Sequence, residues 1–536
     1  MAAAAAASGR SPSALASNAL VDAVASLSSS AAQLVGGIAA ETAGYWAQRF
    51  FNRVVARSLH IDYYRHLADA AVNYEQWHAA AQMLDHLHGQ DDWKADATSP
   101  LYEWRLVQDR LYQLQKARAT HDIDAMLFTL RTSMTRNLGN MGNPQLYMQA
   151  LTGTKRLIES YVDEVALQLE IIADSGSTPW TIDDAFDFLK NTQTAYGRTA
   201  LLLSGGATFG LAHIGVVQTL LEQHLLPKIV SGSSVGSLIA AVVCTRLDDE
   251  LPSFALPEHI NLDVFESEAE RAQPWPRLQK IVRFLRDGVV FDPAVFSAAI
   301  QDNVGMLTFQ EAYNRTRRVL NITVSSSTAF EMPRMLNYLT APNVLIWSAV
   351  VASCAIPFVY QPAVLLSKDS RASDTMWETS QLRWIDGSVE GDIPIARIAE
   401  LFNVNHFIVS QVNPHVIPFL DRTGNPGPLR RATARLADVA LCEVQHRCQQ
   451  LKQLGLSTVA GQSLLAITSQ KYIGDITIIP PFDLSDAMGL LSNPDARLFN
   501  RFCHLGRHAA WHLLPMIRNH CKVELTIDRL LNRLRA

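Results

Sequence analysis

Residues 198–246 contain two glycine-rich turns, Ser204-Gly205-Gly206-Ala207-Thr208-Phe209-Gly210 and Gly232-Ser233-Ser234-Val235-Gly236. A short apolar run precedes each turn, and a stretch with helical periodicity follows it. Strand, turn and helix, repeated in succession, are typical of parallel strands joined by crossover helices. The pattern predicts two strands and two helices, which in chain order are 200–204, 211–224, 229–231 and 235–246.

Later apolar runs extend this pattern into a larger sheet. A buried helix is expected over 344–352, ending before Pro357. The sequence therefore predicts an α/β fold with a three-layer, parallel sheet, preceded and followed by helical regions. Its further strands are expected at 319–325, 382–385 and 406–411.

The sequence outside the sheet is mostly helical in pattern. Asn143 fits an N-cap before Pro144, and the helix that begins there is expected to run to about Ile172. The polar stretch 368–378 is expected to be an exposed loop. We expect four segments: a low-complexity, amphipathic N-terminal segment 1–60, a helical domain 61–195, the α/β domain 196–415 and a C-terminal helical region 416–536.

Composition narrows the class of protein. A chain of 536 residues, 48% apolar and 18% charged, is long enough for two to four domains with their own cores. A formal net charge of -5 gives no reason to expect a nucleic-acid partner. None of the six cysteines forms a C-x-x-C pair, which argues against zinc and for reduced thiols in the core.

The N-terminal segment supports two interpretations. Residues 1–40 are rich in Ala and Ser and contain almost no acid, as in a transit peptide for an organelle. The same composition is typical of a disordered tail, which we favour. The aromatic and basic stretch 45–53 fits either a helix at a lipid interface or a first helix packed on the body.

Ser234 lies at the centre of a Gly-x-Ser-x-Gly pattern. A serine hydroxyl is a weak nucleophile, so it needs an exposed turn, a base and donors for an oxyanion. Gly232 and Gly236 permit such a strained elbow between strand and helix. The alternative, ordinary turn glycines, fits less well with a position between a buried strand and an apolar helix. Ser234 is therefore the candidate nucleophile.

The first glycine turn could hold an anion in either of two ways. A dinucleotide pyrophosphate would need G-x-G-x-x-G and an acidic residue after the next strand. The glycines stand instead at Gly205, Gly206 and Gly210, and the next strand ends without an acid. We favour an oxyanion site, in which the amides of Gly206 and Ala207 face a substrate carbonyl oxygen.

The candidate base is Asp386, which follows a predicted strand and precedes Gly387. In α/β proteins, catalytic side chains commonly lie at the carboxyl ends of the strands. A Ser-His-Asp triad is the rival arrangement, with His213, His406 or His415 as its base. For each of these histidines a structural or surface role is the simpler interpretation.

These residues resemble the patatin-like phospholipases over 198–412, and in particular the triacylglycerol lipases of yeast lipid particles and the plant sugar-dependent lipases. The glycine loop, Gly-x-Ser-x-Gly and Asp-Gly carry the resemblance. The stretch 74–170 is also similar to the helical domain that precedes the patatin fold in that subgroup. Further shared segments are 227–236, Ala352-Ser353-Cys354-Ala355-Ile356-Pro357, 409–415 and the loop 136–144.

The resemblance implies a catalytic dyad without histidine, in which Ser234 is the nucleophile and Asp386 its base. It makes Gly205, Gly206, Ala207 and Gly210 the oxyanion loop, and Gly232, Gly236 and Gly387 the glycines of the two turns. No metal or organic cofactor is implied. The sequence departs from the family at Phe209, where many members have Arg or Lys, and at Ser388, where Ala or Gly is usual.

The resemblance further implies a lipid acyl hydrolase that acts on triacylglycerol or another glycerolipid. It places the protein on the cytoplasmic side of a lipid droplet or membrane surface. A phospholipase or lysophospholipid acyltransferase would use the same acyl-enzyme. A non-catalytic lipid-droplet binding protein is the alternative of another class, against which the intact Ser234 and Asp386 argue.

The C-terminal stretch 523–535 predicts an amphipathic helix with a basic edge. Such a helix could rest on a lipid surface or could simply pack as a terminal helix, and the second interpretation is favoured. Its apolar face consists of Val523, Ile527, Leu530, Leu531 and Leu534, beside Arg529, Arg533 and Arg535.

Overall fold

The computed structural model describes residues 56–174, 180–272, 276–326, 333–357, 359–368, 374–377, 383–386, 394–413, 443, 450, 473–483, 486 and 490–535. The chain forms two compact units, Met1–His88 and Gly89–Ala536. In the first, α2 (Ala56–Asp69) packs on α3 (Tyr74–His88), and Trp77 of α3 is buried. The second unit contains the sheet and the remaining described helices.

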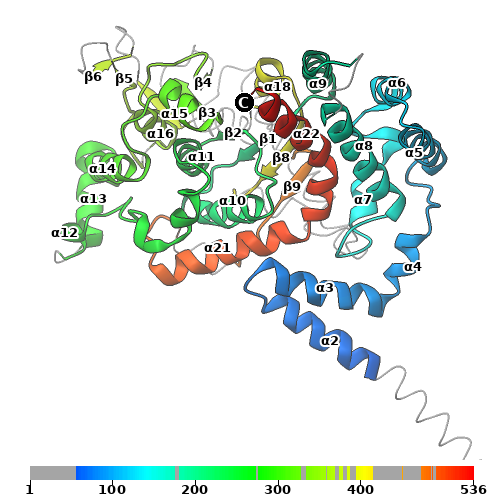
Figure 1. Cartoon of the computed structure of the whole chain (residues 1–536). Helices are drawn as coiled ribbons and strands as arrows, with labels where there is room; N and C mark the ends of the chain where they lie inside the picture. The colour runs from blue at the N-terminus through cyan, green and yellow to red at the C-terminus, as the bar shows by residue number, and fades with distance from the viewer. Residues whose placement is uncertain are drawn as a thin grey trace, which may run out of the picture. The chain divides into compact units, whose positions relative to one another are not determined.

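The second unit is built on a mixed, mostly parallel sheet in the order β4-β3-β2-β1-β8-β9 (Figure 1). Four parallel pairings join β3, β2, β1, β8 and β9, whereas β4 and β7 are antiparallel to β3. This confirms the α/β sheet that the sequence predicts. The strands are β1 (Arg198–Leu203), β2 (Ile229–Gly232), β3 (Val319–Ser326), β4 (Arg334–Leu336), β7 (Trp384–Asp386), β8 (Val404–Ser410) and β9 (Ile476–Ile478).

Helices cover both faces of the sheet. The chain moves from β1 through α10 (Ala212–Glu222), β2 and α11 (Val235–Thr245) to β3, and then returns through α18 (Ile395–Phe402) to β8 on the other side of β1. Crossovers between parallel strands are right-handed, so reversing their direction moves the connecting helix to the opposite face. Because the direction reverses there, the boundary between the neighbouring strands β1 and β8 is a topological switch point. At such points α/β proteins form clefts at the carboxyl ends of the strands.

The other helices of the second unit surround this sheet. Those before it are α4 (Gln90–Ala95), α5 (Trp104–Ala119), α6 (Ile123–Ser133), α7 (Pro144–Tyr147), α8 (Arg156–Asp174) and α9 (Ile182–Tyr196). Those after β2 are α12 (Glu268–Arg271), α13 (Pro276–Asp287), α14 (Pro293–Val304), α15 (Phe309–Thr316), α16 (Ile346–Ser353), α21 (Ala496–Trp511) and α22 (Leu514–Arg535). The short 3-10 helices are η2 (Leu138–Asn140), η3 (Ala207–Leu211), η4 (Leu251–Ala255) and η5 (Pro257–His259).

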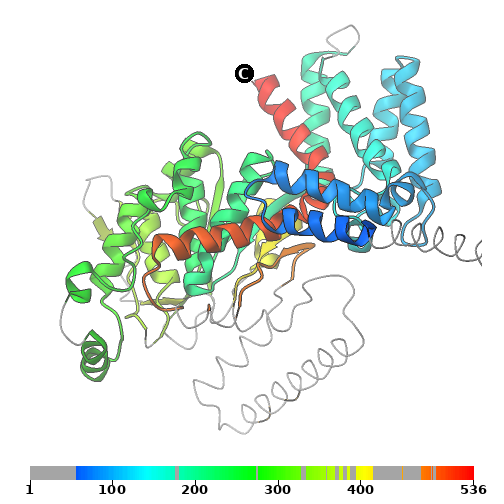
Figure 2. The same cartoon turned by 90° about the horizontal axis from the view of Figure 1, so that it is seen from below.

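Two glycines allow α21 to lie directly against α10 (Figure 2). A Cβ atom on Gly215 of α10 would collide with the backbone of Cys503, and one on Gly506 of α21 with that of Ala212. The two backbones therefore meet without intervening side chains. Close backbone approach of this kind is what a glycine permits and any larger residue blocks.

The terminal helix α22 packs on α8, α9 and β1. Val523, Ile527, Leu530 and Leu531 are buried, so the apolar face that could have met a lipid surface covers the protein's own core. The basic side chains pair with α8 at Lys522–Asp163 (2.6 Å), Arg529–Glu170 (2.5 Å) and Arg533–Asp174 (2.6 Å). The favoured interpretation, a packed terminal helix, is the one that the structure shows.

The two compact units are divided differently from the four segments that the sequence suggests, because the boundary after His88 falls inside the predicted helical domain 61–195. Helices α4 to α9 and the C-terminal helices share one unit with the sheet, and α22 packs on both α8 and β1. Two local predictions were wrong. The helix at Pro144 ends after one turn at Tyr147, and α8 begins only at Arg156. The stretch 368–378 is not all loop, since β5 (Leu366–Lys368) pairs with β6 (Asp374–Met376).

The break between α7 and α8 has a local cause. Gly153 adopts a φ of 84° in the left-handed region, which interrupts a right-handed helix. Next to it, the hydroxyl of Thr154 donates to the carbonyl oxygen of Leu146 (2.8 Å). The Lys155 ammonium reaches back to the carbonyl oxygens of Trp93 and Asp96, each at 2.8 Å.

None of the helices in the described part of the chain is both long enough and apolar enough to span a membrane.

Candidate functional site

Ser234 occupies a strained turn between β2 and α11. Its φ of 49° and ψ of −130° lie in a region that residues with a Cβ atom rarely adopt. Added Cβ atoms at Gly232 and Gly236 would collide with the backbone of Gly236 and Leu203, so both positions require glycine. The strain and the two glycines together form the elbow that the sequence pattern predicts.

Ser353 supports this elbow from the end of α16. The backbone N–H of Ser234 donates to Ser353 Oγ (3.1 Å), and that hydroxyl donates to the carbonyl oxygen of Thr323 (2.7 Å). Both Ser234 and Ser353 are buried, with 5% and 0% of their surface exposed. The turn is thus tied to α16 and to β3 rather than left free as a loop.

Asp386 reaches the same place through the sheet. On β3, Ile322 pairs with Gly232 of β2, and two residues later Val324 pairs with Asp386 of β7. Val324 also pairs with β4, which occupies the other edge of β3. Strand β7 therefore pairs with the same edge of β3 as β2 does, beyond the point where β2 ends. This pairing places Asp386 beside the turn that begins at Gly232.

Cys354 adjoins both the serine and the aspartate. Its thiol is near the Ser234 and Ser237 side chains and near the Asp386 carboxylate. Burial raises the pKa of this thiol far above its ordinary value, and the charge of Asp386 raises it further. The next residue, Ala355, accepts a hydrogen bond from the Asp386 backbone N–H (3.1 Å). The structure thus brings both predicted dyad residues to one short segment of chain.

The glycine-rich loop after β1 borders the same turn. A Cβ atom on Gly206 would press against Val412, which follows β8, and one on Gly210 would collide with Val235. Next to these close approaches, the Ser204 hydroxyl accepts a hydrogen bond from the Val412 backbone N–H (2.9 Å). The loop is thereby held between the ends of β1 and β8 and the start of α11, at the switch point of the sheet.

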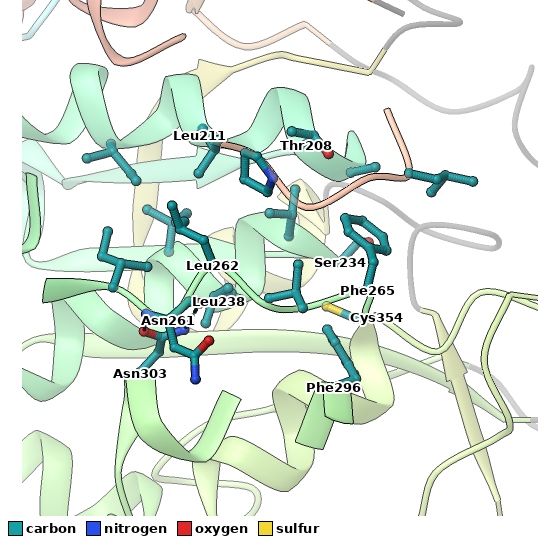
Figure 3. A pocket seen from close by; sticks show the side chains of 18 of the residues that line it. Thr208, Leu211, Ser234, Leu238, Asn261, Leu262, Phe265, Phe296, Asn303 and Cys354 are labelled. Atoms are coloured by element: carbon teal, nitrogen blue, oxygen red, sulfur yellow. Dashed lines mark hydrogen bonds between the residues drawn. The ribbon is translucent and has the colours of Figure 1, made fainter. Parts of the chain in front are cut away.

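An apolar cavity opens beside Ser234, and the centre of a water-sized sphere can reach about 90 Å³ of it (Figure 3). Ala207 of the glycine loop, Ser234 and Cys354 line it together. In Figure 3, Ser234, Cys354 and Phe265 lie near one end of the cavity, and Asn261 and Asn303 near the other. Most of its other lining residues are aliphatic or aromatic, among them Leu211, Ile214, Leu238, Ile239, Phe254, Leu262, Phe296, Val359 and Tyr360.

The two asparagines do not make the far end a strong polar site, because their polar groups are already bonded within the protein, with the Asn261 side chain donating to Asp302 (2.8 Å). The backbone N–H of Asn261 donates to Asn303 Oδ1 (2.9 Å), and Asn303 Nδ2 donates to the carbonyl oxygen of Asn261 (2.9 Å). A cavity with this lining suits a hydrocarbon chain, since burying apolar surface is favourable in proportion to its area.

His213 is fully buried, and both of its ring nitrogens are engaged. Its Nε2 lies 2.9 Å from the carbonyl oxygen of Ser204, which can only accept, so Nε2 carries the proton. Its Nδ1 then accepts from the Ser410 hydroxyl at 2.8 Å. Burial lowers the pKa of His213 to about 4. His213 therefore joins the ends of β1 and β8 as a neutral ring.

His406 lies at the opposite end of the sheet. It is paired with Thr199 at the start of β1, and its Nε2 is 3.0 Å from Nδ1 of His520. Parallel strands run the full depth of the sheet between this residue and the turn at Ser234. His415 lies outside the described residues, as do Gly387 and Ser388.

The low pKa of His213 predicts a loss of stability in acid. Below pH 6.5 the unfolded chain binds a proton that folded His213 takes up only near pH 4, so unfolding becomes easier as the pH falls between these values. We expect His213 to reduce the free energy of unfolding by about 2 kcal/mol between pH 7 and pH 5. Urea unfolding at both pH values measures this loss. His213→Gln, which keeps a donor and an acceptor, should remove that share of the pH dependence. An unchanged pH dependence in the variant would contradict the prediction.

Sequence reasoning did not assign Ser353, Cys354 or the aromatic wall of the cavity. The segment 352–357 was informative, because a small, apolar motif ending in proline follows a buried helix there. That pattern alone does not show that its residues adjoin Ser234 and Asp386. The contact depends on how β7 joins the edge of β3.

Comparison with known families agrees with this arrangement. The model described as patatin-like phospholipase matches residues 201–398, and one described as a domain of unknown function, DUF3336, matches 54–194. Triacylglycerol lipase ptl3 of Schizosaccharomyces pombe is 38% identical over 87% of this chain and 96% of its own length. The chain belongs to the patatin-like phospholipase family.

Other relatives of this patatin-like protein are longer than it is. Triacylglycerol lipase 4 of Saccharomyces cerevisiae is 38% identical over 87% of the chain, which spans 52% of that relative. Triacylglycerol lipase SDP1L of Arabidopsis thaliana is 39% identical over 87% of the chain, which spans 58% of it. The patatin-like protein thus covers little more than half the length of these two relatives.

Proposed function

We propose that this patatin-like protein is a serine acyl hydrolase that releases fatty acids from triacylglycerol. The observation that carries the proposal is the strained turn at Ser234, which opens on an apolar cavity and lies beside Asp386 through the pairing of β7 with β3. The relatives with the names given above support triacylglycerol as the substrate.

In the proposed mechanism Asp386 accepts the proton of the Ser234 hydroxyl as Oγ attacks the ester carbonyl. The resulting oxyanion is held by amides of the glycine loop, Gly205, Gly206 and Ala207. The tetrahedral intermediate collapses, the proton passes to the leaving glyceryl oxygen, and an acyl-serine remains. Water then attacks the acyl-serine with Asp386 again as base, and the free fatty acid leaves.

The positions of the histidines favour a Ser-Asp dyad over a Ser-His-Asp triad. Both ring nitrogens of His213 bind Ser204 and Ser410, and burial keeps this ring neutral. His406 lies at the amino end of β8, whereas Ser234 follows the carboxyl end of β2. Neither His213 nor His406 is therefore placed to act as the base, which leaves this role to Asp386.

The cavity supports a long acyl chain as the group that is transferred. Its apolar wall begins at Ser234 and Cys354, so a chain bound there would hold its ester next to the serine hydroxyl. Substrate binding would then come mainly from buried hydrocarbon surface rather than from recognition of a head group. We propose that the protein works at the surface of a lipid droplet, where such esters are found.

A fluorophosphonate probe tests whether Ser234 is an activated nucleophile. We expect the wild-type protein to be labelled at Ser234, and prior incubation with an excess of a long-chain acyl inhibitor that fills the cavity should prevent the labelling. The products of triolein and of phosphatidylcholine emulsions should be measured with the same protein, with lysophosphatidic acid added as an acceptor in a parallel sample. Absence of labelling would favour a non-catalytic lipid-binding protein, and acylation of the acceptor would favour a transferase.

A further inference from the structure

Helix α13 presents its apolar side outward. Four apolar residues of the helix show the pattern: Ile281, Val282, Phe284 and Leu285 are exposed by 56%, 55%, 43% and 78%. A helix on the surface of a globular protein normally turns its apolar stripe to the core and its charges to water. The apolar residues of α13 lie on one side of the helix, and that side faces away from the protein.

The polar side of α13 faces the protein instead. Lys280 forms an ion pair with Glu266, and its ammonium lies 4.8 Å from the centre of the Phe291 ring. Arg283 pairs with Glu270 at 2.6 Å and lies 3.8 Å from Asp292. The helix is therefore attached through its charges, which leaves its apolar side available to something else.

The same contacts connect α13 to the wall of the acyl cavity. Phe291, which Lys280 covers, packs against Phe265 at 5.2 Å and Tyr360 at 5.8 Å between ring centres. Phe265 and Tyr360 line the cavity beside Ser234. In Figure 1, α13 lies at the outer edge of this unit, beyond α14. Helix α13 thus lies outside Phe291, and Phe291 in turn lies outside the cavity wall that would contact the substrate.

The charge of the helix indicates what could cover it. Residues 276–287 contain four basic residues and one acidic residue, a formal charge of +4 − 1 = +3. Exposed apolar residues flanked by Lys and Arg are the composition of helices that lie in the boundary between phospholipid head groups and acyl chains. Lys280 and Arg283 are paired with the protein's own acids, so the described basic residue that an anionic head group could meet is Arg286, whose side chain is 78% exposed and pairs with Asp287 of the same helix. The acyl boundary accepts the apolar residues.

We propose that α13 docks this protein on the phospholipid monolayer of a triacylglycerol droplet. The choice of droplet depends on the function proposed above, because only a triacylglycerol lipase needs its cavity held against such a surface. Docking by α13 would place the aromatic wall of the cavity next to the lipid. A substrate could then pass from the monolayer to Ser234 without crossing water.

Flotation of the full chain with artificial droplets tests the docking separately from catalysis. The probe is a triolein droplet coated with phosphatidylcholine and a minority of phosphatidylserine, and the protein carries Ser234→Ala. We expect the double variant Ile281→Ser, Leu285→Ser to lower the bound fraction at least about tenfold. The matched control, Phe128→Ser with Ile182→Ser, changes two apolar side chains exposed by 69% and 59% on other helices, and it should bind as the parent does.

Activity of the same variants with Ser234 intact separates the two proposals. The α13 variant should hydrolyse coated triolein droplets about tenfold more slowly but a water-soluble butyrate ester within about twofold of wild type. Equal flotation of the α13 variant and the parent, or equal losses in the control pair, would overturn the docking proposal. If no variant hydrolyses either ester while Ser234→Ala protein still floats through α13, the hydrolase proposal fails and the docking proposal stands.

Discussion

Replacing Ser234 by alanine is expected to abolish hydrolysis of triolein while the protein remains folded. The change removes the only atom that forms the acyl-enzyme bond in the proposed mechanism, and loss of a serine nucleophile costs about 10⁴-fold to 10⁶-fold in rate in comparable hydrolases. Alanine adds no atoms, so the strained backbone at φ 49° is no more crowded than before. Release of fatty acid from an emulsion, with circular dichroism as the check on folding, measures the effect.

Ser231 provides the matched control. It is also a buried serine, three residues earlier at the end of β2, and its hydroxyl makes no hydrogen bond within the part of the chain that the structure describes. Ser231→Ala should therefore keep activity within a few fold of wild type. If Ser234→Ala retained a tenth of the wild-type rate, the nucleophile would have to be a different residue.

Replacing Asp386 by asparagine is the second large effect that we expect. Asparagine keeps the size of the side chain and the backbone hydrogen bond to Ala355, but it cannot accept the serine proton. Removal of the acidic member of a serine triad by this change lowers kcat by about 10⁴-fold, and we expect a loss of similar size here. The loss should fall on kcat more than on KM, because the cavity that binds the acyl chain is unaltered.

The control for this change is Asp495→Asn. Asp495 caps α21 by accepting from the Leu498 backbone N–H (2.7 Å), and asparagine caps helices about as well. Histidine variants complete the experiment: His213→Gln, His406→Gln and His415→Gln should each retain activity. The dyad would be refuted if one of them abolished activity in a folded protein while Asp386→Asn did not.

Local sequence predicted the parts of this site that local geometry determines. The elbow at Ser234 needs glycines at fixed positions because the backbone of Leu203 passes close to Gly236, and that requirement is visible in the sequence. The two strands before the turns are short apolar runs, and their pairing follows from the order of elements. Sequence reasoning therefore located β1, β2 and the serine turn to within a few residues.

Contacts between distant segments were less predictable. Asp386 could be identified by its motif, but its position beside the serine turn depends on β7 joining β3 in the antiparallel direction. The terminal helix shows the same difficulty, because its amphipathic pattern fits both a lipid surface and the protein's own core. Only the packing of α22 on α8 and α9 separates these interpretations.

The glycine contact between α10 and α21 limits how small a working version of this protein could be. The segment that matches the patatin-like family ends at residue 398, whereas Gly506 lies more than a hundred positions later. A fragment trimmed to the family boundaries would expose the face of α10 around Gly215 and would also lose β8 and β9 from the sheet. Anyone shortening the gene to isolate the hydrolase would therefore need to retain residues through α22.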